Sequence, residues 1–358
     1  MNGNEKKRET FFAIALLLPL LLVMPGFVLA DGGHVPPRPS PGVQPYRVFE
    51  PNQQAVVAWN NDREILILAT TIYANAPTRV LRLIPFPSEP QVEQGDWTTF
   101  DFLKQYQTRY QEDYGIMPGA MGAAAESKAQ VVFHKRVGTH TLTAVRVEDA
   151  GELEGFTQGY EAASGLKFDF TEIRPIVANY VARGVKYFVF DLIEVDVEPR
   201  DTNPVIYSFD SKYAFYPLEI SSTTQGRADV ALYLITPAGA QEIHDAKDPM
   251  TPSRLPLSFA GSHSLAAYEL LKVGRNVSEL MRGGTGSETV GEADLRVYTY
   301  SGQLRDLTQD FVIKMSGNGE SRALPGSEED YSSLLWLTAG VLLVCAALAF
   351  YAFKRWYL

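Results

Sequence analysis

Cysteine is almost absent from this sequence. The single cysteine, Cys345, lies in an apolar run near the C-terminus. Disulfide bonds within the chain are therefore excluded, and the body of about 300 residues must be stabilised by an ordinary hydrophobic core, which a chain of that length can bury. The residues before 334 also contain no thiol for nucleophilic catalysis.

Motifs of hydrolases and metalloenzymes are absent as well. The sequence has no Gly-x-Ser-x-Gly and no His-Glu-x-x-His. His134 and His140 would face each other only across a three-residue loop, and no third zinc ligand is visible. Ser262 and Ser264 flank His263, but adjacent side chains point apart, so we predict that one of these serines caps a helix. No catalytic residue, metal or cofactor is predicted.

Two further motifs carry little functional weight. The glycine-rich stretch 283–287 lacks the Lys-Ser or Lys-Thr of a phosphate-binding loop, so we expect a mobile loop there. Asn276-Val277-Ser278 is a glycosylation sequon, which indicates surface exposure at best.

Basic residues are fewer than acidic residues in the middle of the chain. Residues 31–333 carry 27 Lys and Arg residues against 40 Asp and Glu residues, a net charge of −13. Such a surface repels nucleic acid, so no nucleic-acid partner is expected.

Carboxylates alternate with apolar residues near the end of a strand predicted at 186–197, which places them on one face. The candidate calcium ligands are Glu194, Asp196, Glu198 and Asp201, but the spacing of a calcium-binding loop is absent and a solvated strand face is the simpler interpretation.

Long hydrophobic runs are absent from the middle of the chain and present at both ends. Residues 334–353 are twenty in a row without a charge, about the length that a helix needs to cross the lipid bilayer. Lys354 and Arg355 follow the run and three acidic residues, 328–330, precede it. This asymmetry predicts a single-pass transmembrane helix with a cytoplasmic tail, 354–358, and an extracytoplasmic body.

The N-terminus has the pattern of a signal peptide. Three basic residues at 6–8 precede an apolar stretch at 11–23, and Val28-Leu29-Ala30 forms a cleavage site. We expect cleavage after Ala30; without it, this segment would be a second membrane helix with both termini inside. A proline-rich leader, 31–45, then enters the body at 46–320, and a linker, 321–333, precedes the membrane span.

The body alternates strand and helix patterns irregularly. We predict helices from Asp96 to about Tyr110, after Asp149, at 173–184 and at 264–272. Strands are predicted at 55–59, 64–71, 78–84, 131–137, 139–147, 186–197, 205–209, 228–236 and 293–300. Short hairpin connections indicate an α+β fold with mainly antiparallel sheet and a few helices, as one domain or as two lobes, 46–147 and 148–320.

Several stretches resemble a widespread family of exported prokaryotic proteins known as a domain of unknown function. That family has a Gly-Gly start, a Pro-x-x-Gln strand and a proline-rich turn ending in Pro-x-Val. The matching residues here are Gly32-Gly33, Pro51 to Gln54, and Pro90-Gln91-Val92, with further similarity as far as about residue 236. The family often has a cysteine before the Gly-Gly pair, where this chain has Asp31, so a lipid anchor or disulfide at that point is excluded. The resemblance implies no activity.

Three functional hypotheses remain open. The first is a single-pass, membrane-anchored extracytoplasmic protein that binds or scaffolds another surface or membrane protein. The second is a membrane-tethered hydrolase whose catalytic carboxylates come from distant parts of the chain, which spacing cannot detect. The third is a calcium-dependent surface module built on the four candidate ligands.

Overall fold

The computed structural model describes residues 33–35, 37–39, 44–107, 130–224, 226–243, 254–283 and 292–315, together with Asp248, Met250 and Pro252. The predicted signal peptide, linker and membrane span lie outside these residues. Within the described part, no helix is long and apolar enough to cross a bilayer.

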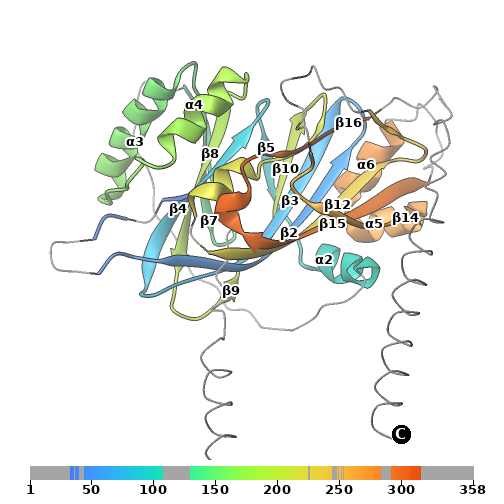
Figure 1. The fold of residues 1–358 in the computed structure, drawn as a ribbon, viewed down its shortest axis with the longest axis horizontal. Coiled ribbons are helices and arrows are strands. Elements are labelled where there is room, and N and C mark those ends of the chain that lie inside the picture. The colour runs from blue at the N-terminus through green and yellow to red at the C-terminus, as the bar shows by residue number, and fades with distance from the viewer. Residues whose placement is uncertain are drawn as a thin grey trace, which may run out of the picture. The chain divides into compact units, whose positions relative to one another are not determined.

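The larger sheet has eight strands, with the order β14-β15-β12-β2-β3-β10-β5 and β9 beside β3 (Figure 1). All neighbours are antiparallel except β12 and β2, which are parallel. Its strands in chain order are β2 (Val48–Trp59), β3 (Arg63–Ala74), β5 (Gln91–Gln94), β9 (Arg200–Asp201), β10 (Val205–Asp210), β12 (Arg227–Pro237), β14 (Ser258–Leu265) and β15 (Ala293–Gln303).

The smaller sheet has five antiparallel strands in the order β1-β4-β8-β7-β6. These are β1 (Gly33–Val35), β4 (Thr78–Phe86), β6 (Gln130–Val137), β7 (His140–Arg146) and β8 (Tyr187–Val195). β7 and β8 pair across residue 147, where the sequence allowed a boundary between two lobes. A third sheet contains β11 (Ala214–Tyr216), β16 (Phe311–Met315) and β13 (Glu242–Ile243).

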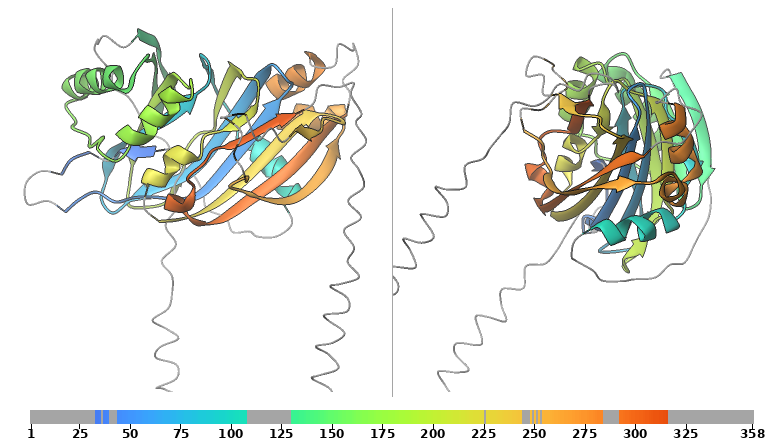
Figure 2. Two further views of the ribbon diagram at one scale, coloured as in Figure 1. Left: turned by 45° about the horizontal axis from the view of Figure 1, so that its top comes forward. Right: turned by 90° about the vertical axis from the view of Figure 1, so that its right-hand side faces the viewer.

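Helices cover the faces of the two main sheets that point away from each other (Figure 2). Against the larger sheet lie α2 (Thr98–Leu103), the 3-10 turn η1 (Lys104–Tyr106), α5 (Ala267–Val273) and α6 (Arg275–Gly283). Against the smaller sheet lie α3 (Ala150–Ser164) and α4 (Arg174–Ala182). Two further 3-10 turns are η2 (Glu219–Thr223) and η3 (Leu304–Asp306).

The hydrophobic core follows from the alternation of side chains along the strands. In β2, Ala55, Val57 and Trp59 face the core between the two sheets, whereas Val56 and Ala58 face the helices. Because both faces of the second half of β2 are covered, residues 55–59 form a continuous apolar run instead of an alternating pattern. The result is a helix–sheet–sheet–helix arrangement of the described residues.

Most predicted elements are confirmed, and their local signals act as expected. Asp149 caps α3 by accepting hydrogen bonds from the backbone N–H groups of Gly151 and Glu152. The turn between β6 and β7 places Gly138 at φ 56°, and Asn203 packs against the position that a Cβ would occupy. Of the helix predicted up to Tyr110, residues 98–106 are helical and 108–110 lie outside the described residues.

The interpretation of the segment before α5 was wrong. Ser262 and Ser264 do not cap a helix, because they lie in β14, which pairs with β15. The helix begins at Ala267, after Ala266 at its N-cap. Strand pairing with β15, a contact distant in sequence, overrides the local capping signal.

Candidate functional site

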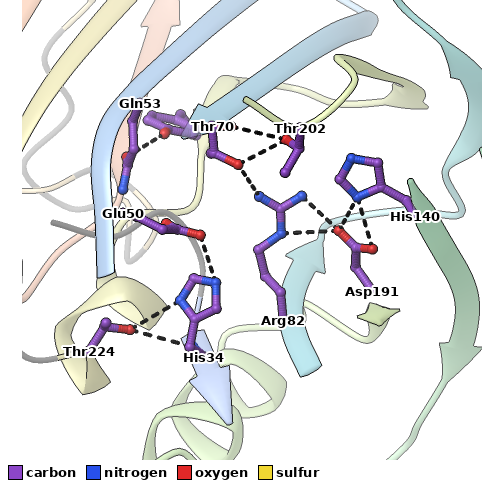
Figure 3. A network of polar contacts seen from close by, with 10 residues as sticks. His34, Glu50, Gln53, Thr70, Arg82, His140, Asp191, Thr202 and Thr224 are labelled. Carbon is purple, nitrogen blue, oxygen red and sulfur yellow. Dashed lines mark hydrogen bonds and ion pairs between the residues drawn. The ribbon is translucent and has the colours of Figure 1, made fainter. Parts of the chain in front are cut away.

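A buried polar centre lies between the two main sheets (Figure 3). Arg82 on β4 and Asp191 on β8 are directly opposed across the sheet. Leu81 and Leu83, the neighbours of Arg82, join the core beneath α3 and α4, so Arg82 itself points to the opposite face, toward the larger sheet. It meets Thr70 of β3 there.

Arg82, Asp191 and His140 form a connected ion cluster. The Nε and Nη2 atoms of Arg82 donate to Oδ2 of Asp191 at 3.2 and 2.7 Å. Nη1 of Arg82 donates to Oγ1 of Thr70 at 3.3 Å, and that hydroxyl lies 3.1 Å from Oγ1 of Thr202. Nδ1 of His140 lies 3.0 and 2.8 Å from the two carboxylate oxygens of Asp191.

Hydrogen bonding indicates the charge on His140. Its Nε2 lies 3.0 Å from the carbonyl oxygen of Asn203, which can only accept, and its Nδ1 faces the carboxylate of Asp191. An imidazole that donates from both nitrogens is an imidazolium. Burial raises the pKa of Asp191, but His140 and Arg82 outweigh burial and hold that pKa below its usual range. One carboxylate therefore stands between two cations.

A second pair, His34 and Glu50, lies beside this cluster (Figure 3). Nε2 of His34 is 2.7 Å from Oε1 of Glu50, and Nδ1 is 3.4 Å from Oγ1 of Thr224. Burial lowers the pKa of His34 from 6.5 to about 3, with Arg82 adding to the shift and Asp191 opposing it. His34 is therefore neutral at physiological pH. Farther along β2, Gln53 accepts a hydrogen bond from the hydroxyl of Tyr216 at 3.0 Å.

This centre is not built to act on a dissolved substrate. Arg82, His140 and Asp191 are each no more than 1% exposed, and His34 is 6% exposed. The Asp191–His140 pair resembles the orienting half of a catalytic triad, but Nε2 of His140 lies 3.0 Å from the backbone carbonyl oxygen of Asn203, a group that cannot act as a nucleophile. What the centre does is connect β1, β4, β7 and β8 of one sheet to β2 and β3 of the other.

A third polar cluster joins α4 to η2 and to the start of β16. Asp310 is buried and accepts from the hydroxyl of Tyr180 at 2.5 Å, from the backbone N–H of Glu219 at 2.9 Å, and from Nη1 of Arg183 at 3.3 Å. Arg183 also donates to the carboxylate of Glu219. Burial raises the pKa of Asp310 to about 6, against the lowering effect of these donors.

A row of aromatic side chains that ends at the exposed Tyr268 forms a different kind of site. We call His263, Tyr106, Phe102, Lys272 and Tyr268 the aromatic strip, because in this order each side chain contacts the next. The ring of Tyr106 lies 5.8 Å from that of Phe102 and 4.9 Å from that of His263. Nζ of Lys272 lies 5.2 Å from the Phe102 ring and 5.3 Å from the Tyr268 ring.

The aromatic strip spans α2, η1, β14 and α5, and its outer end is open to solvent. Tyr268 is 62% exposed, and Leu271, one helical turn further along α5, is 54% exposed. The hydroxyl of Tyr106 donates to Glu269 at 2.9 Å, which fixes its ring. Burial and Glu269 raise the pKa of Tyr106 to about 12, so it remains a donor. Rigid rings with polar tips are typical of protein contact surfaces.

The four candidate calcium ligands take separate roles. Glu194 and Glu198 are exposed, Asp196 pairs with Arg200 at 3.0 Å, and Asp201 accepts from the hydroxyl of Thr71 at 2.6 Å. Among the described residues, no group of three or more His, Cys, Asp and Glu side chains is placed to hold a metal ion. The described residues therefore provide no ligand set for the calcium hypothesis.

The structure also gives no shared site to the other candidates from the sequence, namely the histidine pair, the sequon and the described part of the glycine-rich stretch. The loop between β6 and β7 has two residues, so His134 opposes Thr143 and His140 opposes Val137. The sequon lies in α6, where Ser278 is fully buried and Asn276 donates to Glu93. Of the glycine-rich stretch, residues 284–287 lie outside the described residues.

Sequence reasoning missed the buried polar centre, although a signal was present. Arg82 and Asp191 are single charges inside the apolar runs VLRLI and VFDLI. A charge that interrupts a strand buried on both faces must be paired, and two such strands indicate each other as partners.

The geometry defines an α+β protein with two helix-covered sheets held together by a buried ion cluster. A family model described as an uncharacterized protein conserved in bacteria (DUF2330) matches residues 42–321, and the chain belongs to this family. The resemblance seen in the sequence is thereby confirmed.

Other comparisons add little. No curated protein matches the chain. The crystal structure of baculovirus P35 matches with 9% identity, covering 75% of this chain and 97% of that chain, at a TM-score of 0.33. A similarity at that level carries no argument about fold or function.

Proposed function

We propose that this protein is a single-pass, membrane-anchored extracytoplasmic module that binds another surface or membrane protein through the aromatic strip. The observation that carries the binding role is the exposure of Tyr268 and Leu271 next to rings fixed by neighbouring contacts. Contact surfaces are enriched in such aromatic side chains and depleted in flexible charges. The anchoring rests on the apolar run at 334–353.

The hydrolase hypothesis is less well supported. The acids in the described part of the chain that are most strongly perturbed, Glu64 and Asp310, are both buried. Glu64 receives the backbone N–H of Phe215, and Asp310 is bound to Tyr180 and Arg183. Each acid is bound to the protein's own groups, which is typical of a structural role.

The binding role predicts that Leu271→Glu weakens capture of the partner. A carboxylate placed beside Tyr268 would have to be desolvated on binding, so we expect about a tenfold loss or more. The measurement is affinity capture from native membranes with the full chain, quantified by mass spectrometry. The matched control is Val197→Glu, because Val197 is 47% exposed and follows β8 of the smaller sheet, whereas the strip is built on α2, η1, β14 and α5. Equal capture by both variants would refute the role of the strip.

The anchoring predicts a cytoplasmic C-terminus. A reporter fused after Leu358 should be active in the cytoplasm and silent outside, and the protein should stay in the membrane after carbonate washing. Release by carbonate, or a reporter active outside, would contradict this part of the proposal without bearing on the aromatic strip.

A further inference from the structure

β14 is an edge strand that lacks the usual protection against pairing. In the described part of the chain it hydrogen-bonds only to β15, so one side of its backbone is unpaired. Its eight residues, SFAGSHSL, include no Lys, Arg, Asp, Glu or Pro. Edge strands are normally guarded by such residues, because an open edge is a template for another strand.

Two other edge strands, β5 and β6, carry such protection. At the other end of the larger sheet, Nζ of Lys135 donates to the backbone carbonyl of Val92 in β5 at 2.9 Å. β5 also carries Glu93, and β6, the edge of the smaller sheet, carries Lys135 and Arg136. The one guarding device in β14 is a β-bulge between Phe259 and Gly261, which leaves 261–265 in regular register with β15.

We propose that β14 pairs antiparallel with β14 of a second copy of this chain, joining the two larger sheets across a two-fold axis. Two-fold pairing sets each residue of the strand against another residue of the same strand. Because β14 has no residue with a permanent charge, such pairing never opposes like charges, apart from the one register that sets His263 against itself. This holds even though the body of the protein is strongly acidic.

The exposure of side chains along β14 is also compatible with pairing to a second copy of this strand. The side chains of 258–260 and 262–264 are exposed, so they do not obstruct an approaching strand. Gly261 lies at the middle of the strand and has open space around it, since the nearest atom to a Cβ built there is His263 Nε2 at 3.9 Å. Pairing of two eight-residue strands is weak by itself. The dimer proposal therefore rests on the proposed membrane anchoring, which confines two copies to one surface and raises their effective concentration.

Cross-linking of the full chain in membranes tests the pairing. In a Cys345→Ala background, single cysteines at Ser258, Ser262 and Ser264 are treated with a short thiol cross-linker. At least one of the three should give a dimer as the major product, because opposed strands bring these positions close in any central register. The control is Val131→Cys, on the guarded edge β6 and 42% exposed, which should remain monomeric.

A charge variant provides the second arm. Ser262→Lys adds the residue that natural edge strands use against pairing, and in lipid vesicles at the same protein density it should convert the dimer to monomer, as counted by single-molecule photobleaching. Val131→Lys should leave the dimer intact. A monomeric wild-type chain in membranes, equal cross-linking at Val131, or a dimer that survives Ser262→Lys would overturn the proposal. Failure of the anchoring is read separately, from the reporter after Leu358.

Discussion

Replacing Asp191 with asparagine is expected to lower the free energy of unfolding by about 3–5 kcal/mol. The carboxylate stands between Arg82 and the imidazolium of His140, at 2.7 and 2.8 Å, in a fully buried position. Asparagine retains the shape but removes the negative charge, which leaves two buried cations without compensation. Such a loss is a large share of the 5–15 kcal/mol typical of a folded domain.

Denaturant unfolding at neutral pH measures this loss, and Asp196→Asn is the control. Asp196 pairs with Arg200 at the surface, where both partners are substantially exposed, so its loss should cost less than about 1 kcal/mol. The triple variant Arg82→Met, Asp191→Leu and His140→Leu should be less destabilised than Asp191→Asn, because it removes all the charges together. A loss below 1 kcal/mol for Asp191→Asn would contradict the charged cluster.

The second large effect is an acid-dependent loss of stability that depends on His34. The pKa of His34 is about 3 in the folded protein, whereas the ordinary value of 6.5 applies in the unfolded chain. Between pH 3 and pH 6.5 the unfolded chain therefore binds more protons than the folded protein. The contribution of His34 to the free energy of unfolding is fully present above pH 6.5 and is lost as the pH falls toward 3. From pH 7 to pH 4 the loss amounts to about 3 kcal/mol.

The His34→Gln variant isolates this contribution. Glutamine does not titrate and keeps an N–H donor toward Glu50, so the variant should lose less stability in acid than the wild type. The quantity to measure is the difference between the two unfolding free energies at pH 7, 6, 5 and 4. His263→Gln, which removes an exposed ring, should run parallel to the wild type.

The wild type and the His34→Gln variant must be compared at each pH, because Asp310 changes the free energy of unfolding with pH in the opposite direction to His34. Its pKa rises from 3.8 to about 6, so the folded state holds the extra proton, and stability falls as the pH rises through this window. The two windows overlap, and in the wild type the effects of His34 and Asp310 partly cancel. Parallel curves for wild type and His34→Gln would contradict the neutral, buried state of His34.

Local patterns in the sequence predicted much of the fold but not its centre. The hairpin of β2 and β3, the cap at Asp149 and the turn at Gly138 depend on residues near one another, so each could be recognised without tertiary contacts. β14 was missed because SFAGSHSL has no strong strand pattern, and β15 supplies its pairing from about thirty to forty residues away. α6 was missed as well, because its buried residues pack on β2 and β3 from a distant part of the chain.

The candidate sites show the same division. Carboxylates adjacent in sequence, such as Glu194 and Asp196, attracted attention because their spacing is visible, yet each faces solvent or a surface partner. Arg82 and Asp191, which are 109 residues apart, meet only because β4 and β8 are neighbours. Tyr106 and His263 likewise meet only in the folded chain.

By itself the sequence determined the chemistry available to this protein: a body without disulfides or thiol catalysis, strongly acidic, with an α+β pattern and membership in a bacterial family. The tertiary structure decided which charges are buried together, which edge strand is open, and which rings reach solvent. These properties depend on strand order and on contacts between residues far apart in the chain, and neither hydrophobic periodicity nor local capping encodes them.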